Sequence, residues 1–396
     1  MQIRTGDRGQ GRARVVESHR LLAAMLLAAG VFGVVGVAWA IGVAIRGGSW
    51  WGPIHALMAG AALSAISGAT QMFTITWSSA RAPRRPLIIT QGVVLWVGVA
   101  LVLVGIPTNR DWIVWSGGTA VVVALILLGA ALLGTIRRSL LRRFDLSIRF
   151  YFVALSAGVI GVTLGVLLGT GSVASRYGDF RQVHLHLNLV GLIGLTVVGT
   201  LPTLLPTFVK HRAVSRREAR IAWWLGVGGV VAIAAGLFAP LWTIGAGTLL
   251  VAAAATTIVV GIVGRLGRKG LRGGLPFFHV LAGVCWLVAW ACVDAFGLLT
   301  EQPLGHFSGW TAAAVVVGVV QVIVGSVAYL VPVLVGPPIG ANLDRMTGNP
   351  WLPVILANAA GVALVAGWTP VATVFLALWI IDLGRRLASL RKPPPR

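Results

Sequence analysis

Four of the seven histidines in this chain stand where they could bind a metal ion. They are His55, His184, His186 and His306. Each lies at the start of a long apolar segment, the second, sixth or tenth along the chain, that we expect to span a membrane. Neutral imidazole is the commonest metal ligand, and it binds haem iron, copper and zinc. The four histidines therefore predict a metal or haem site near one face of the membrane.

The segments that carry these histidines belong to an all-α integral membrane protein. Hydrophobic residues make up 57% of the chain and charged residues 11%, which excludes a soluble globular domain. About 20 apolar residues cross a bilayer, and the backbone must be hydrogen-bonded internally, so the spans are helices. We predict twelve transmembrane helices, at residues 21–45, 54–79, 87–106, 111–136, 148–170, 182–209, 221–239, 241–264, 276–299, 307–335, 352–368 and 370–388.

The distribution of positive charge predicts the topology. The net charge is +22, but all except four of the 32 Lys and Arg residues fall in loops or tails on one side. This is the positive-inside pattern, so we predict that both termini are cytoplasmic. Residues 1–20 form a basic N-terminal segment, 21–388 the membrane domain and 389–396 a cytoplasmic tail. The charge reflects topology and contact with the lipid bilayer, and we predict no nucleic-acid binding.

An internal repeat links the histidine-bearing spans. His55 begins the pattern H-x4-G-x7-G in the second span, and His186 begins the same pattern in the sixth. His306 opens the tenth span, where Thr311 replaces the first glycine. The histidines are separated by the length of four spans, which favours three four-helix pseudo-repeats, at about 21–136, 148–264 and 276–388.

Two neighbouring histidines in the sixth span must face different directions. Residues at i and i+2 of a regular helix lie about 200° apart, so His184 and His186 cannot share a face. The repeat selects His186 as the counterpart of His55. Arg181, His184 and Asn188 form a polar stripe on the other face, which lines either a second site or the water interface. His186, His184 and Met58, one turn below His55, are the candidate metal ligands, although a Met at helical spacing is more often packing material.

Two charged residues near the same face are further candidates. Arg181 is one of four arginines expected outside, and a haem propionate there would need such a partner. Asp294 lies about a turn and a half from the outer end of the ninth span. A carboxylate at that depth costs roughly 2–3 kcal/mol to insert, so it is a functional candidate.

Twelve spans, cytoplasmic termini, and outer histidines on helices two, six and ten resemble subunit I of the haem–copper oxidase superfamily. The segment 186–201 is also similar to the corresponding helix of oxidase-like membrane proteins of high-GC bacteria, some of which occur beside or fused to copper nitrite-reductase-type modules. The chain also resembles the nitric-oxide-response (NnrS-like) proteins, another group with twelve spans. The resemblance implies that His55 and His306 are axial ligands of a b-type haem and that His186 or His184 binds copper. It also implies a multi-pass protein of the bacterial plasma membrane.

The chain departs from the oxidase pattern at three places. Helix ten reads His306-Phe307-Ser308, without the second histidine of the family. The histidine pair after helix seven is missing, and Val190 stands at the position of the helix-six tyrosine. The resemblance therefore implies an incomplete binuclear centre, and we do not expect oxygen reduction coupled to proton pumping.

Three functions remain open from the sequence. The first is a haem-binding, oxidoreductase-like membrane protein, with or without copper, that takes part in electron transfer or nitrogen-oxide metabolism. Its partner would be a periplasmic or extracellular electron-transfer or cupredoxin-type protein. The second is a transporter or metal-handling permease that uses the same histidines, and the third is a cofactor-free structural subunit.

Overall fold

The computed structural model describes residues 6–139, 145–209, 215–266, 274–304, 308–335 and 338–390, and these residues form helices with no strand. The predicted all-α class is therefore confirmed. The chain divides into two compact units. Unit 1 comprises Met1–Gly199 and Ile233–Phe238, and unit 2 comprises Thr200–Ala232 and Ala239–Arg396.

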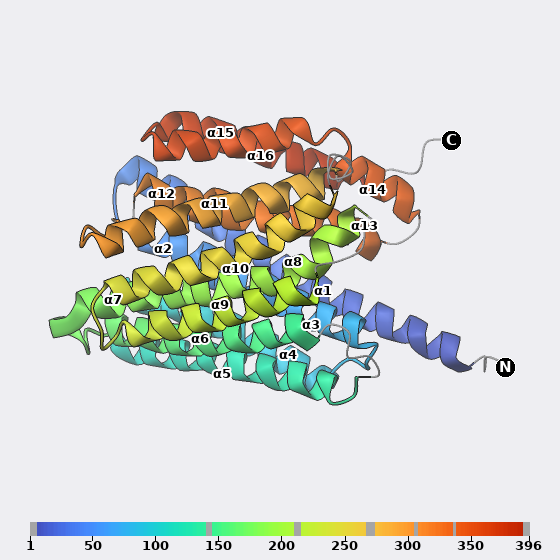
Figure 1. Cartoon of the computed structure of the whole chain (residues 1–396), viewed down its shortest axis with the longest axis horizontal. Helices are drawn as coiled ribbons and strands as arrows, with labels where there is room; N and C mark the ends of the chain where they lie inside the picture. The colour runs from blue at the N-terminus through green and yellow to red at the C-terminus, as the bar shows by residue number, and fades with distance from the viewer. Residues whose placement is uncertain are drawn as a thin grey trace. The chain divides into compact units, whose positions relative to one another are not determined.

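Unit 1 contains the first five predicted spans and the first half of the sixth (Figure 1). Its elements are α1 (Gly6–Arg46), α2 (Trp51–His55), η1 (Ala56–Ala62), α3 (Leu63–Ser78), α4 (Arg85–Gly105), α5 (Asp111–Ile136), α6 (Asp145–Gly169), η2 (Ala174–Arg176), α7 (Tyr177–His186), η3 (Leu187–Gly194) and the first turn of α8 (Leu195–Phe208). The label η marks π-helical segments, except for η2, which is a 3₁₀ turn.

Unit 2 contains the remaining helices. They are most of α8 and of α9 (Arg216–Ala235), then α10 (Trp242–Leu266), α11 (Gly274–Leu299), α12 (Gly309–Ala312), η5 (Ala313–Val319), α13 (Val320–Val335), α14 (Ile339–Thr347), α15 (Trp351–Val365) and α16 (Thr369–Ser389). Helices α15 and α16 lie side by side as a hairpin (Figure 1).

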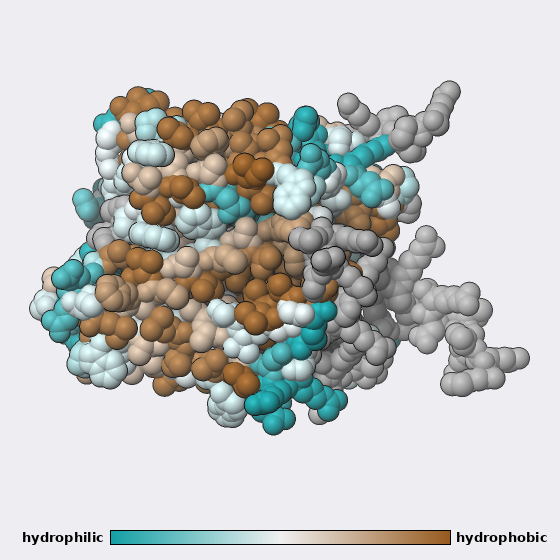
Figure 2. Space-filling model, turned by 45° about the horizontal axis from the view of Figure 1, so that its top comes forward, coloured by the Kyte–Doolittle hydropathy of each residue, from teal (hydrophilic) through white to brown (hydrophobic). Residues whose placement is uncertain are grey.

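The outer surface of these helices is apolar, as a membrane protein requires. Large hydrophobic side chains such as Val34, Ile126 and Phe296 are more than half exposed. Hydrophobic residues also cover most of the face shown in Figure 2, whereas hydrophilic ones gather mainly toward its edges. An exposed apolar surface of this extent is stable only in contact with lipid. The chain is therefore a multi-pass membrane protein.

Ten helices in the described residues are long and apolar enough to cross a bilayer, and they match the first ten predicted spans. The eleventh predicted span contains α15, whose 15 residues would rise only about 22 Å against a hydrocarbon core of about 30 Å. It could complete a span only together with α14, from which it is bent by 43°. In the twelfth, α16 carries Asp382, Arg385 and Arg386. The described residues therefore support ten or eleven of the twelve predicted spans.

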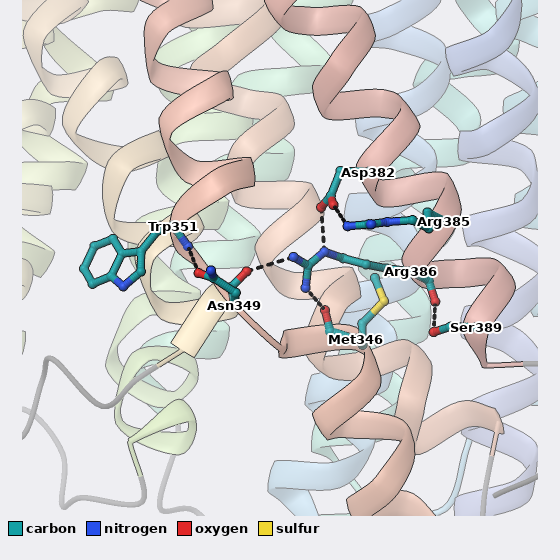
Figure 3. A network of polar contacts seen from close by, with 7 residues as sticks. All are labelled: Met346, Asn349, Trp351, Asp382, Arg385, Arg386 and Ser389. Atoms are coloured by element: carbon teal, nitrogen blue, oxygen red, sulfur yellow. Dashed lines mark hydrogen bonds and ion pairs between the residues drawn. The ribbon is translucent and has the colours of Figure 1, made fainter. Parts of the chain in front are cut away.

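A buried arginine closes the break between α14 and α15 (Figure 3). The guanidinium of Arg386, on α16, donates to the carbonyl oxygens of Met346 at 3.1 Å and Asn349 at 2.8 Å. It also donates to the carboxylate of Asp382 at 2.6 Å. Arg386 thus satisfies carbonyls that the end of α14 leaves without helical partners, and it holds the bend in place.

Helices α4 and α5 pack through a pair of glycines. A Cβ added to Gly117 would lie 2.8 Å from the carbonyl oxygen of Gly98, and a Cβ added to Gly98 would lie 2.8 Å from that of Gly117. Small residues allow such close backbone approach between membrane helices.

Gly117→Ala should therefore lower the stability of the protein in detergent by about 1–3 kcal/mol, because the new methyl group meets rigid backbone. SDS denaturation followed by tryptophan fluorescence measures the change. Gly129→Ala is the matched control on α5, since its Cβ would meet only Leu155 at an ordinary 3.8 Å. Equal stability of the two variants would contradict this packing.

Each of the three histidine-bearing spans contains a π-helical segment. These segments are η1 in the second span, η3 in the sixth and η5 in the tenth. The first two begin directly after His55 and His186, the residues that the repeat aligns. π-Helical turns are rare and are frequently found at functional sites. They also shift the helix register, so side chains before and after them do not follow the regular 3.6-residue period.

Candidate metal centre

The start of the second span fixes the ring of His55. Helix α2 begins at Trp51, and Nδ1 of His55 lies 2.8 Å from the backbone carbonyl oxygen of Trp51, one turn earlier. The indole of Trp51 also stacks on the imidazole, with ring centroids 4.3 Å apart and planes at 23°. The same residue therefore holds the ring of His55 through both its backbone and its side chain.

Two glycines on α6 make room for the side chains of His184 and Asn188. Nδ1 of His184 lies 2.7 Å from the carbonyl oxygen of Gly161. A Cβ at Gly165 would lie 2.6 Å from Cε1 of His184, and one at Gly161 would lie 2.6 Å from the side-chain nitrogen of Asn188. The face of α6 defined by Gly161-x3-Gly165 thus receives the polar stripe that includes His184 and Asn188.

The two imidazoles lie next to each other. The ring centroids of His55 and His184 are 6.2 Å apart, and the planes are inclined by 15°. A carbonyl oxygen only accepts hydrogen bonds, so Nδ1 of each ring carries the proton and donates it. This tautomer leaves the lone pair on Nε2, for which the described residues show no hydrogen bond. A carbonyl behind Nδ1 is the usual support of a metal-binding histidine.

The separation of the rings matches that of two imidazoles on one metal. Each metal–nitrogen bond is about 2 Å, and the nitrogen is roughly 1 Å from its ring centre, so opposed imidazoles have centres about 6 Å apart. Among the described residues no group of three or more His, Cys, Asp or Glu side chains could hold a metal ion. The described residues therefore bring two imidazole rings together at this candidate site and add no third His, Cys, Asp or Glu side chain that completes a metal site.

His186 occupies a different environment. It is fully buried, and its Nδ1 lies 2.8 Å from the carbonyl oxygen of Gln182, which repeats the relation of His55 to Trp51. The ring that lies beside His55 is nevertheless that of His184. The residue aligned by the repeat and the residue brought close in space are therefore different.

The remaining predicted site residues are placed as follows. Met58 is half-buried within η1, and the guanidinium of Arg181 lies 6.0 Å from the ring centre of Tyr177. Asp294 is buried in α11 of unit 2, with 2% of its surface exposed. His306 lies outside the described residues, so its predicted pairing with His55 stays a prediction.

Sequence reasoning did not identify Trp51, Gly161 or Gly165 as parts of this centre. An aromatic residue four positions before a histidine is only a weak signal for a ligand support. Any residue type at that position offers a backbone carbonyl to the imidazole. The G-x3-G spacing on the fifth span was a usable signal for close helix approach. Comparisons with protein-family models and with curated proteins gave no match.

Gly165→Ala should weaken metal or haem binding by about 10–100-fold, the usual cost of losing a support behind a ligand. Its Cβ would displace the ring of His184 from the carbonyl of Gly161. Titration of the purified protein with haemin and with Cu(I) measures the affinity. Gly158→Ala should leave it unchanged, because that Cβ meets only the flexible ends of Leu192 and Leu125. The same affinity in both variants would contradict the supporting role of this α6 face.

Proposed function

We propose that this chain is a membrane redox protein that holds a haem or a copper ion between His55 and His184. The observation that carries the proposal is the pair of imidazoles 6.2 Å apart, each with Nδ1 against a backbone carbonyl. Haem iron and copper change oxidation state by one electron, and that electron transfer is the chemistry the bound group would supply.

The chain's own residues prepare the two ligands. The carbonyls of Trp51 and Gly161 keep the proton on Nδ1 and increase the basicity of the opposite nitrogen. Stacking on Trp51 limits rotation of the His55 ring. The ligands are thus oriented before any metal arrives, which lowers the entropic cost of binding.

An oxidase-like arrangement remains part of the proposal. In that version His55 binds haem together with His306, and His184 or His186 belongs to an incomplete copper site. Arg181 would pair with a propionate, and Asp294 would be a nearby ionisable group. The protein would lie in a bacterial plasma membrane with both termini in the cytoplasm, and a soluble electron-transfer or cupredoxin-type protein would dock on the outer face.

A pair of imidazoles also suits Cu(I), which favours a metal-handling permease as the second candidate. One experiment separates the two. The full chain is purified from haem-replete, copper-supplemented cells, and its reduced-minus-oxidised spectrum and metal content are measured. A Soret band with about one iron per chain supports the haem form. Bound copper that does not change oxidation state supports the permease. A purified protein with neither haem nor copper would overturn both candidate functions.

A further inference from the structure

Four arginines gather at one end of unit 1, and we call them the arginine cluster. Arg84 and Arg85 stand at the start of α4, and Arg137 and Arg138 directly follow the end of α5. All four side chains are exposed. The two helices lie side by side (Figure 1), so the cluster depends on the direction in which each of them runs.

Helices α4 and α5 run antiparallel. A Cβ added to Gly98 would meet the backbone of Gly117, and a Cβ added to Gly105 would meet that of Val114. Residue numbers therefore fall along α5 as they rise along α4. The start of α4 and the end of α5 lie at the same end of the helix pair, and so do the arginines that they carry.

The end of α3 belongs to the same corner of unit 1. The hydroxyl of Ser139, the residue after Arg138, donates to the carbonyl oxygen of Ser78 on α3 at 3.2 Å. The turn formed by residues 79–84 thus begins beside the end of α5 and finishes at the start of α4. Arginines from both helices border this turn.

The described residues supply no counter-charge for the arginine cluster. Arginines elsewhere in the chain, such as Arg176, Arg265 and Arg386, form ion pairs with Asp or Glu. The four arginines of the cluster form no ion pair with any described residue. Like charges that gather in this way repel one another, so a bound anion would stabilise them. Guanidinium groups are especially suited to phosphate, which they bind through two parallel hydrogen bonds.

An exposed apolar stripe continues from the cluster along each helix. Its members are Ile89, Val93 and Val97 on α4 and Leu133, Ile126 and Val123 on α5. On α4 they follow Arg85 at steps of four residues, and on α5 they precede Arg137 at steps of three, four or seven. Residues with these spacings share one face of a helix, so each stripe ends at an arginine.

The two stripes are long enough to contact acyl chains. The helix rises about 18 Å from Arg85 to Val97 and about 21 Å from Arg137 to Val123. One leaflet of the hydrocarbon core is about 15 Å thick. A phosphate site that continues into two apolar stripes matches a phospholipid, which carries a phosphate and two acyl chains, better than a free phosphate ion.

We propose that the arginine cluster and the two apolar stripes bind one anionic phospholipid, with its phosphate at the arginines and its acyl chains along α4 and α5. Basic sites on membrane helices recognise such headgroups. The site differs from general contact with the bilayer, because it retains one lipid at named residues. It is independent of the candidate metal centre. The bound lipid neutralises the cluster and stabilises the corner where α3, α4 and α5 meet.

Native mass spectrometry of the full chain in a neutral detergent tests the proposal. The protein is titrated with phosphatidylglycerol, which is anionic, and separately with phosphatidylcholine, which has no net charge. We expect one phosphatidylglycerol to bind at least about 10-fold more tightly than phosphatidylcholine, since each arginine near an anionic headgroup contributes roughly fivefold in affinity. Equal affinity for the two lipids would overturn the proposal, whatever the variants show.

Replacing three arginines of the cluster together, as Arg84→Gln, Arg85→Gln and Arg137→Gln, should lower the affinity for phosphatidylglycerol at least about 10-fold. These side chains are exposed, so the variant should fold, and its elution volume checks this. Glycerol phosphate, which has a phosphate but no acyl chains, should not displace the lipid at equal concentration. Displacement by glycerol phosphate would assign the cluster to a free phosphate and overturn the proposal.

The matched control removes the same charge at another place. Arg216, Arg217 and Arg220 are exposed arginines in the first two turns of α9. Their joint replacement by Gln should leave the tightest binding of phosphatidylglycerol unchanged. Equal losses in the two triple variants would show that the lipid responds only to net charge, and the site at α4 and α5 would be wrong.

Discussion

Replacing Arg386 by Met should lower the free energy of unfolding by about 3–5 kcal/mol. The guanidinium is 10% exposed and bonds at once to Asp382, Met346 and Asn349 (Figure 3). Met fills a similar volume but donates no hydrogen bond. The substitution would leave two carbonyl oxygens unpaired and remove one of the two positive charges beside the buried carboxylate of Asp382. Helix α14 would then lose its hydrogen bonds to α16.

SDS denaturation of the purified protein, followed by tryptophan fluorescence, measures this effect. Arg385→Met is the matched control, because Arg385 also bonds to Asp382, at 2.7 Å, but its side chain is 73% exposed. Exposed ion pairs contribute about 0–1 kcal/mol, so the control should be nearly as stable as the wild type. Equal losses in the two variants would show that the carbonyl contacts of Arg386 contribute little.

Part of this network around Arg386 could be predicted from the sequence. Asp382 and Arg386 are four residues apart on an apolar helix, a spacing that predicts an ion pair. The backbone carbonyls of Met346 and Asn349 gave no such signal, because any residue type has a carbonyl group. The break between α14 and α15 depends on which carbonyls find a donor, so the span boundaries near it could not be fixed from hydropathy.

The candidate metal centre shows a similar limit. Hydropathy predicted twelve membrane helices, and the first ten are present in the described residues, with histidines near the start of the second and sixth. The pattern H-x4-G-x7-G then favoured His186 as the counterpart of His55, whereas His184 lies beside it. The sequence repeat corresponds to a shared local structure, because a π-helical segment follows both His55 and His186. Which histidine lies close to His55 depends on the packing against α6, whose glycines Gly161 and Gly165 face the side of the sixth span that carries His184.

His55→Ala and His184→Ala should each abolish stoichiometric binding of the metal or haem, with affinity reduced by more than about 100-fold. The reason is that a two-ligand centre loses half of its protein bonds, whereas removal of an outer support alone costs about 10–100-fold. The ring left behind keeps its bond to a backbone carbonyl, at 2.8 Å for His55 and 2.7 Å for His184, so the remaining ligand stays oriented. Metal analysis and the reduced-minus-oxidised spectrum of each purified variant measure the loss.

Two further histidine variants test which histidine is the partner of His55. His186→Ala removes a fully buried imidazole from the same segment and should retain the bound group, provided that its elution volume shows a folded protein. His306→Ala should also retain it if His184 is the true partner of His55. Loss in His306→Ala with retention in His184→Ala would instead assign the haem to the oxidase-like pair. The ring spacing of 6.2 Å between His55 and His184 would then reflect helix packing alone.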